Sequence, residues 1–133
     1  MSSYSVELMQ EKEKWNDCVD KSPMGSIFHK FEFLEVIKKH TSSQLHTLVG
    51  YKGQEPIGLF PVFEIKRGPM STVFSPPPEV GIPFIGPILV NYENLKQKKK
   101  ESRNRNFIEK IVEYINNNIS PSYISITSSP EYK

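Results

Sequence analysis

The spacing of apolar residues predicts the first elements of the chain. Residues 4–9 alternate between apolar and polar and predict a short strand. Residues 10–20 predict a helix, which Pro23 and the glycine that follows it bring to an end. An apolar stripe at spacings of three and four residues then predicts a second helix over residues 26–40, capped by Ser26.

From Leu45 the apolar period changes to two, which predicts a β-hairpin. Its strands cover residues 45–51 and 56–66, and the turn covers residues 52–55. The second strand is apolar on both sides, so we expect it to be covered on both faces. Pro61 lies in the middle of this strand and has no N–H group. We therefore expect a bulge, a ladder edge or an interruption of the sheet at that point.

The remaining pattern predicts a short strand over residues 72–74, an extended piece over 87–90, a helix over 94–118 and a last strand over 122–127. The long helix should turn five apolar side chains to the core, namely Phe107, Ile108, Ile111, Val112 and Ile115. The predicted core of the whole domain contains Trp15, Phe31, Leu34, Leu59, Phe63 and Ile111.

Composition fits one globular domain over residues 1–133, since 37% of the residues are hydrophobic and 24% are charged. No segment approaches the run of about 18 apolar residues that a membrane span needs, and the start carries no secretory pattern. We therefore expect no membrane span and a cytoplasmic location. Cys18 is the only cysteine, so an internal disulfide is excluded, and its place on an apolar stripe predicts a core residue.

The net charge of +2 implies no particular partner, but the charges are unevenly distributed. Residues 96–105 contain six basic side chains and one acidic side chain. A solvated helix start or a mobile loop is the favoured interpretation. Binding of nucleic acid such as tRNA through phosphate contacts is a weaker alternative, because the run lacks the interleaved aromatic residues that stack on bases.

The order of the elements, together with five short motifs, resembles a known family. The motifs are SPMG, FEFL, EPIGLFPVF, IGPILV and ISITSSPEY. In this order they are similar to the amino-terminal half of FemAB-like aminoacyl transferases, which consist of two halves of the GNAT acyltransferase type. The resemblance covers nearly the whole chain and implies an α/β (α+β) fold with a mixed, largely antiparallel sheet flanked by helices. Family members usually have a tryptophan where Phe33 stands. They also continue past Lys133, so the resemblance implies a domain that is incomplete at its carboxyl end.

The proline-rich stretch FSPPPEVGIPFIGP, residues 74–87, does not fit a cofactor loop. In a GNAT-type core that binds acyl-coenzyme A, this position carries a glycine-rich loop whose N–H groups hold pyrophosphate. Five prolines here have no N–H group to donate, and the two glycines are wrongly spaced. We therefore expect no cofactor, and we interpret the stretch as the stiff wall of a groove.

Few residues suggest chemistry. His29 and Glu32 are three residues apart on the predicted second helix, and His29, Lys30 and Lys38 could bind an anionic acceptor there. An ordinary solvated surface is the alternative, and we prefer it. The histidines do not have the spacing of metal ligands, and no catalytic residue is predicted.

These patterns, with the resemblance, predict a scaffold and acceptor-side half of an acyl or aminoacyl transferase, which is inactive alone. The sequence does not identify the acceptor, which is a small molecule or a peptide. The alternative is a stand-alone domain that acts as a protein interaction module. As partner we expect either the missing carboxyl-terminal half or a second copy, bound at an open sheet edge or at the cleft around residues 58–61.

Overall fold

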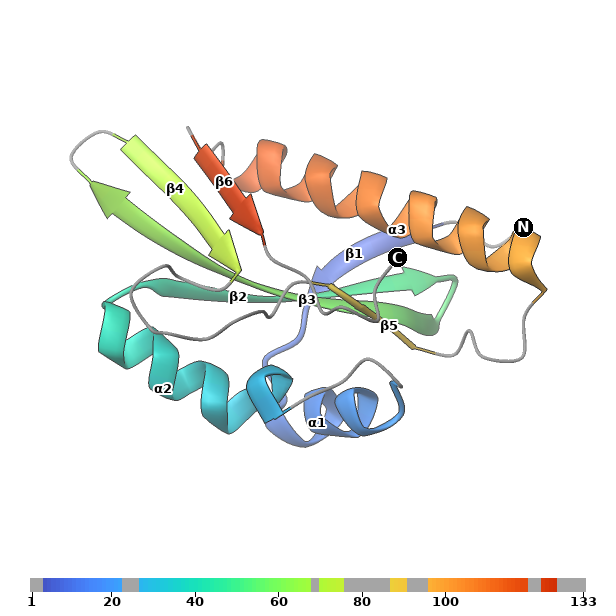
Figure 1. Cartoon of the computed structure of the whole chain (residues 1–133), viewed down its shortest axis with the longest axis horizontal. Helices are drawn as coiled ribbons and strands as arrows, with labels where there is room; N and C mark the ends of the chain where they lie inside the picture. The colour runs from blue at the N-terminus through green and yellow to red at the C-terminus, as the bar shows by residue number, and fades with distance from the viewer. Residues whose placement is uncertain are drawn as a thin grey trace.

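The chain forms one sheet with helices on both faces (Figure 1). The structure, a computed structural model, describes residues 4–22, 27–67, 70–75, 87–90, 96–119 and 123–126. The elements are, in order, β1 (Tyr4–Leu8), α1 (Lys12–Asp20), the 3-10 turn η1 (Ile27–His29), α2 (Phe31–Thr41), β2 (Gln44–Lys52), β3 (Glu55–Arg67), β4 (Met70–Ser75), β5 (Ile88–Leu89), α3 (Gln97–Asn118) and β6 (Tyr123–Ile126).

The expected fold class is confirmed, because the sheet is mixed and largely antiparallel. Its strands follow the order β1-β2-β3-β4-β6, and β5 pairs with β3. All of these pairs are antiparallel except β4 with β6, which run parallel. The long helix α3 lies between β5 and β6 in sequence, so it supplies the crossover that brings β6 alongside β4.

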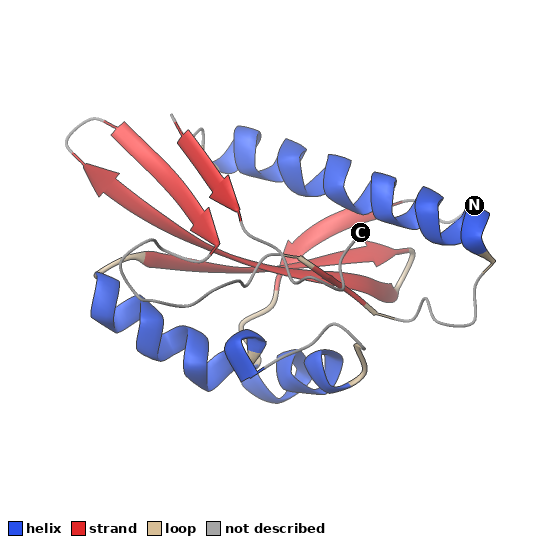
Figure 2. Cartoon of the chain, in the orientation of Figure 1, coloured by secondary structure: helices blue, strands red, loops and turns tan. Residues whose placement is uncertain are grey.

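Helices cover the two faces unequally (Figure 2). One face carries α1, η1 and α2, and the opposite face carries α3. Alternate residues of β3 point to the two sides: Leu59 and Phe63 are buried on one face, and Phe60 and Val62 are buried on the other. The prediction that this strand is covered on both faces is therefore confirmed.

Two glycines let α3 approach the sheet closely. Gly50 of β2 and Gly58 of β3 are direct partners across the hairpin, and the ring of Phe107 lies over both. A Cβ atom at Gly50 would lie 2.4 Å from the Phe107 ring, and one at Gly58 would lie 2.6 Å from it. Side chains at these positions would push the helix away, so the glycines fix the height of α3 above the sheet.

The predicted helix over residues 26–40 is wrong in its first part. The structure has the short turn η1, an extended residue at Lys30 and only then α2. Contacts with α1 explain the break. The indole N–H of Trp15 donates to the carbonyl of His29 at 2.7 Å, and the side-chain oxygen of Asn16 accepts the N–H of Phe31 at 2.8 Å. These bonds satisfy backbone groups that a continuous helix would pair internally. Ser26, the predicted cap, lies outside the described residues.

The interruption expected at Pro61 is present. On one side of β3, β5 pairs with Gly58 and Leu59, whereas β4 pairs only from Phe63 onward. Between them the carbonyl of Pro61 accepts the hydroxyl of Ser75 at 2.6 Å. Because N–H and C=O of one strand residue point to the same side, the missing N–H of Pro61 faces this gap. The irregularity in the β2–β3 ladder lies instead between Gly50 and Tyr51.

The predicted core is largely confirmed in the described residues, but the expectation that Val112 faces the core is wrong, since this residue is exposed. Five of the six predicted core residues are fully buried, and the sixth, Phe31, is only partly buried against the core. The predicted last strand matches β6, whereas the long helix begins at Gln97, later than predicted, because the backbone of Lys96 is extended. Most of the proline-rich stretch, residues 76–86, lies outside the described residues. No helix in the described part is long and apolar enough to span a membrane.

Candidate functional site: an apolar cavity between α3 and β6

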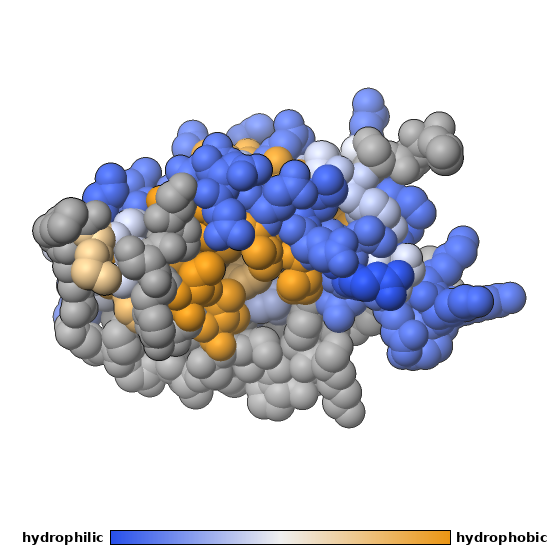
Figure 3. Space-filling view, turned by 90° about the horizontal axis from the view of Figure 1, so that it is seen from above, coloured by the Kyte–Doolittle hydropathy of each residue, from blue (hydrophilic) through white to orange (hydrophobic). Residues whose placement is uncertain are grey.

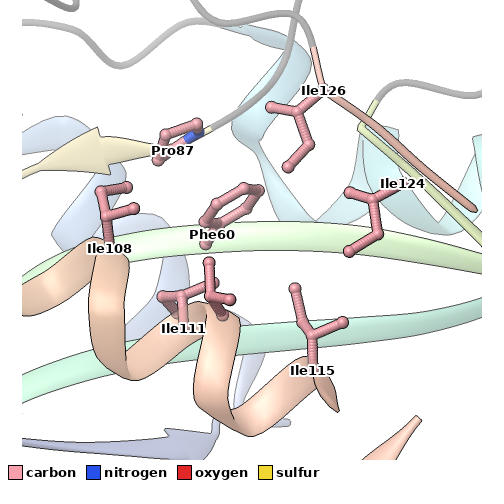
Figure 4. Close-up of a pocket in the computed structure, with 8 residues that line it drawn as sticks. Phe60, Pro87, Ile108, Ile111, Ile115, Ile124 and Ile126 are labelled. Atoms are coloured by element: carbon pink, nitrogen blue, oxygen red, sulfur yellow. The ribbon is translucent and has the colours of Figure 1, made fainter. Parts of the chain in front are cut away.

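The face that carries α3 is not fully covered, and apolar side chains reach the surface in the middle of it (Figure 3). A cavity of about 170 Å³ opens there, between α3 and the sheet (Figure 4). Its lining comes from β3, the residue before β5, α3 and β6, and consists of Phe60, Pro87, Ile108, Ile111, Val112, Ile115, Ile124 and Ile126. All of these residues are apolar.

Ordinary periodicity brings these side chains together. Ile124 and Ile126 are two apart on β6, so they share one face, and the parallel register places them beside Val73 and Ser75 of β4. Ile108, Ile111 and Ile115 recur on α3 at spacings of three and four residues. These three share one side of the helix and face the strands (Figure 4).

The cavity has a closed floor and an open rim. Ile111 and Ile115 are buried, whereas Val112, Ile124 and Ile126 are 45%, 38% and 41% exposed. Isolated exposed apolar residues are common, but here three of them border one cavity. The lining offers neither a hydrogen bond nor a charge, so the cavity suits an aliphatic or aromatic group and not a polar one.

A basic region lies at the other end of α3. Lys96, Lys98, Lys99 and Arg105, with Glu101 and Ser102, line a hollow at the start of the helix. The first turn of α3 contains no acidic residue, although a helix start favours negative charge. Arg103 is different, since it lies 3.5 Å from the carboxylate of Glu55.

The structure does not bring the three predicted substrate-binding residues together. His29 is fully buried in η1, which corrects its predicted place on the polar side of a helix. The break at Lys30 is the reason, because the 3-10 turn directs this side chain into the core. Lys30 pairs with Asp20 of α1, and Lys38 is exposed in the last turn of α2.

Glu32, the predicted partner of His29, has other neighbours. Asn16 donates to its carboxylate at 2.7 Å, and the ammonium of Lys12 lies 3.6 Å from it. The hydrogen bond from Asn16 is the main cause that lowers the pKa of Glu32 below its usual value. Glu32 therefore joins α1 to α2 instead of forming an acid–base pair.

The sequence prediction missed a buried polar cluster on three neighbouring strands. Glu64 of β3 is 7% exposed; Ser71 of β4 donates to its Oε2 at 2.6 Å, and Nε2 of His46 of β2 lies 3.1 Å from its Oε1. Burial raises the pKa of Glu64, but the bonds to Ser71 and His46 outweigh burial, so the pKa is lowered. In the structure, alternation along β2 and β3 puts His46 and Glu64 on the same face as Gly50 and Gly58, which α3 covers, but no local pattern reveals that the two side chains meet.

One of the two predicted partner surfaces is filled. The strand segment around residues 58–61 is buried, since Phe107 lies over Gly58 and β5 pairs along the strand edge. The outer edge of β5 is also occupied, because the hydroxyl of Ser22 donates to the carbonyl of Leu89 at 2.6 Å. Among the described strands, none pairs with the outer edge of β6.

No protein-family model and no curated protein sequence matches the chain. The resemblance to FemAB-like proteins therefore stays a prediction.

Proposed function

We propose that this chain is a binding half of an acyl or aminoacyl transferase, in which the cavity beside α3 holds an aliphatic part of the substrate. One observation carries this proposal: the cavity is entirely apolar and opens where β6 runs parallel to β4. In the GNAT-type cores that the sequence resembles, the acyl donor inserts where the middle strands separate. The order of strands and the crossover by α3 are consistent with that type of core.

The role proposed for the residues is binding and exclusion of water. Phe60, Ile111 and Ile115 form an apolar floor, and Ile124 and Ile126 form a partly exposed side at the rim. A ligand that buries its aliphatic part there gains about 0.8 kcal/mol for each methylene group. The lining supplies no acid, base or nucleophile, so the reacting groups of the transferase would come from the other half.

A binding experiment with a neutral aliphatic ligand tests this role. Hexanamide should shift the NMR signals of isoleucine methyl groups at the cavity, and Ile126→Asp should weaken binding by about tenfold or more, because it places a carboxylate at an apolar rim. Val36→Asp is the matched control, since it makes the same kind of change at an exposed aliphatic residue of α2. Equal binding by both variants, or signal changes elsewhere only, would contradict the proposal.

A second candidate function is the protein interaction module. It is favoured by an open hollow on the α1–α2 side, where Ile27 and Val36 are 66% and 63% exposed and Phe33 is part of the same lining. Under this alternative the chain self-associates through α2, and Val36→Ser shifts the sedimentation of concentrated protein toward the monomer. Ile126→Ser should leave that association unchanged. A monomer at all concentrations would remove self-association as the function of this surface.

A further inference from the structure

Phe60 lies where one edge of β3 is without a strand partner. Along that edge β5 pairs with Gly58 and Leu59, and β4 pairs from Phe63 onward, so no described strand pairs with residues 60–62 there. Of these three residues, only Phe60 lines the cavity. Its side chain lies among side chains of α3 and β6 (Figure 4). Phe60 therefore stands where the cavity meets the gap between β5 and β4.

The ring of Phe60 closes the cavity on the side of the sheet. Phe60 is buried, whereas Ile124 and Ile126 at the rim are partly exposed. Two residues earlier on the same face of β3, the ring of Phe107 lies on Gly58 and occupies the space under α3. A chain that enters at the rim is thus stopped by Phe60 and has no path along the strand toward Gly58.

The volume and the chemistry of the lining define what fits above this ring. A cavity of about 150 Å³ can hold a molecule of the size of benzene, and this cavity has about 170 Å³. The described lining offers no charge and no hydrogen bond, so the group that enters is neutral and apolar.

We propose that the cavity accepts a neutral aliphatic chain of about six carbon atoms, and that Phe60 sets this length. Each methylene group that enters the apolar lining leaves water and adds to the affinity. A methylene group beyond that length meets the ring and has no space, so it stays in water. This inference rests on the proposed function and deepens it, because it names the class of substrate group and the residue that selects it.

The test measures the affinity of the full chain for butanamide, hexanamide and octanamide by titration of the isoleucine methyl signals. Wild-type protein should gain about threefold to fourfold in affinity for each methylene group between butanamide and hexanamide. Octanamide should bind no more tightly than hexanamide. Phe60→Ala should restore the gain of about threefold to fourfold for each of the last two methylene groups. Phe60→Leu, which leaves a smaller hole in the core, should restore about one of these two steps.

Phe63→Leu is the matched control. It makes the same change on the same strand, but Phe63 is buried on the opposite face and does not line the cavity. The ratio of the affinities for octanamide and hexanamide should therefore stay as in the wild type. A change that only loosens the fold would alter this ratio equally in Phe63→Leu and Phe60→Leu.

The outcomes separate this inference from the function on which it rests. If wild-type protein gains the same affinity for each methylene group up to octanamide, Phe60 sets no length limit and the apolar site stands. If Phe60→Leu keeps the wild-type ratio, or Phe63→Leu changes it equally, the role of Phe60 is overturned. This comparison decides the matter even where Phe60→Ala does not fold. If no amide binds to the wild-type protein, the proposed function fails together with the inference.

Discussion

The two faces of the sheet are built in different ways. On the α1–α2 face, Trp15 of α1 donates to the carbonyl of His29 and Asn16 accepts the N–H of Phe31, which fixes the break before α2. Fully buried side chains such as Leu34 fill the core there. On the other face, α3 approaches the sheet closely where Phe107 lies on two glycines, and Ile111 and Ile115 are buried further along the helix. The rest of that face has an apolar cavity and a buried polar cluster.

Under the proposed function, the two faces have different roles. A face filled to native density has little room for a ligand, and each carbon removed from it weakens the fold. A face that leaves aliphatic side chains at the surface loses some stability and keeps a place for a partner molecule. Changes on the two faces should therefore have unequal effects on stability and on binding.

The largest contrast should come from matched truncations. Leu34→Ala on the α1–α2 face should lower the free energy of unfolding by about 2–5 kcal/mol, because it leaves a cavity in a fully buried core. Ile126→Ala removes a side chain of the same size from the cavity rim and should cost less than about 1 kcal/mol, since Ile126 is already partly exposed. Urea denaturation of both variants measures the contrast. Equal losses would mean that the α3 face is as tightly packed as the other.

The close contact of α3 should be the sensitive part of its face. Gly58→Ala should cost about 1–3 kcal/mol, because the new methyl group would lie 2.6 Å from ring atoms of Phe107. The cost should shrink when the same change is made in a Phe107→Leu background, and a double-mutant cycle measures this coupling. If the two changes are simply additive, something other than the Phe107 ring limits the approach of α3.

Sequence patterns predicted the elements better than their junctions. The period of two in residues 45–66 identified β2 and β3, because alternation is a property of the strand itself. The break at Lys30 was not predictable in this way. It depends on Trp15 and Asn16, which are fourteen and fifteen residues away from the backbone groups that they bind. Tertiary contacts of this kind override the helical pattern of a short segment.

The candidate site was less predictable than the fold. Phe60 and Ile111 were both expected to face a core, but the cavity exists only because β6 pairs with β4 in parallel. No local pattern specifies that pairing. The spacing of His29 from Glu32 suggests a pair only if both residues lie on one helix. Because His29 lies in the 3-10 turn and is buried, the two side chains do not form that pair.

The buried polar cluster should make stability depend on pH. The pKa of Glu64 is lowered in the folded chain. The stability that Glu64 supplies is therefore fully present above the ordinary carboxyl pKa of about 4.3, and it is lost as the pH falls through the lower pKa of the folded chain. Near neutral pH, Glu64→Gln should cost about 1–2 kcal/mol, because it replaces charged hydrogen bonds by neutral ones.

Denaturation curves between neutral and acid pH measure this difference. It should be constant near neutral pH and should shrink on acidification. Glu109→Gln, at an exposed position of α3, is the control and should change stability little at any pH. A difference between wild type and Glu64→Gln that grows as the pH falls would contradict the assigned sign, and would indicate that Glu64 is protonated in the folded chain.

The smallest effect concerns the helix junction on the α1–α2 face. Asn16→Ala removes the acceptor for the N–H of Phe31 and the donor to Glu32, and should cost about 1 kcal/mol, as the loss of a helix cap does. Lys14→Ala is the control on the same helix. It removes only an exposed pair with Glu11 at 3.2 Å and should cost less than about 0.5 kcal/mol. If the two variants lose the same stability, the residues of α2 themselves determine where α2 starts. The α1–α2 face and the α3 face would then differ less in packing than the structure indicates.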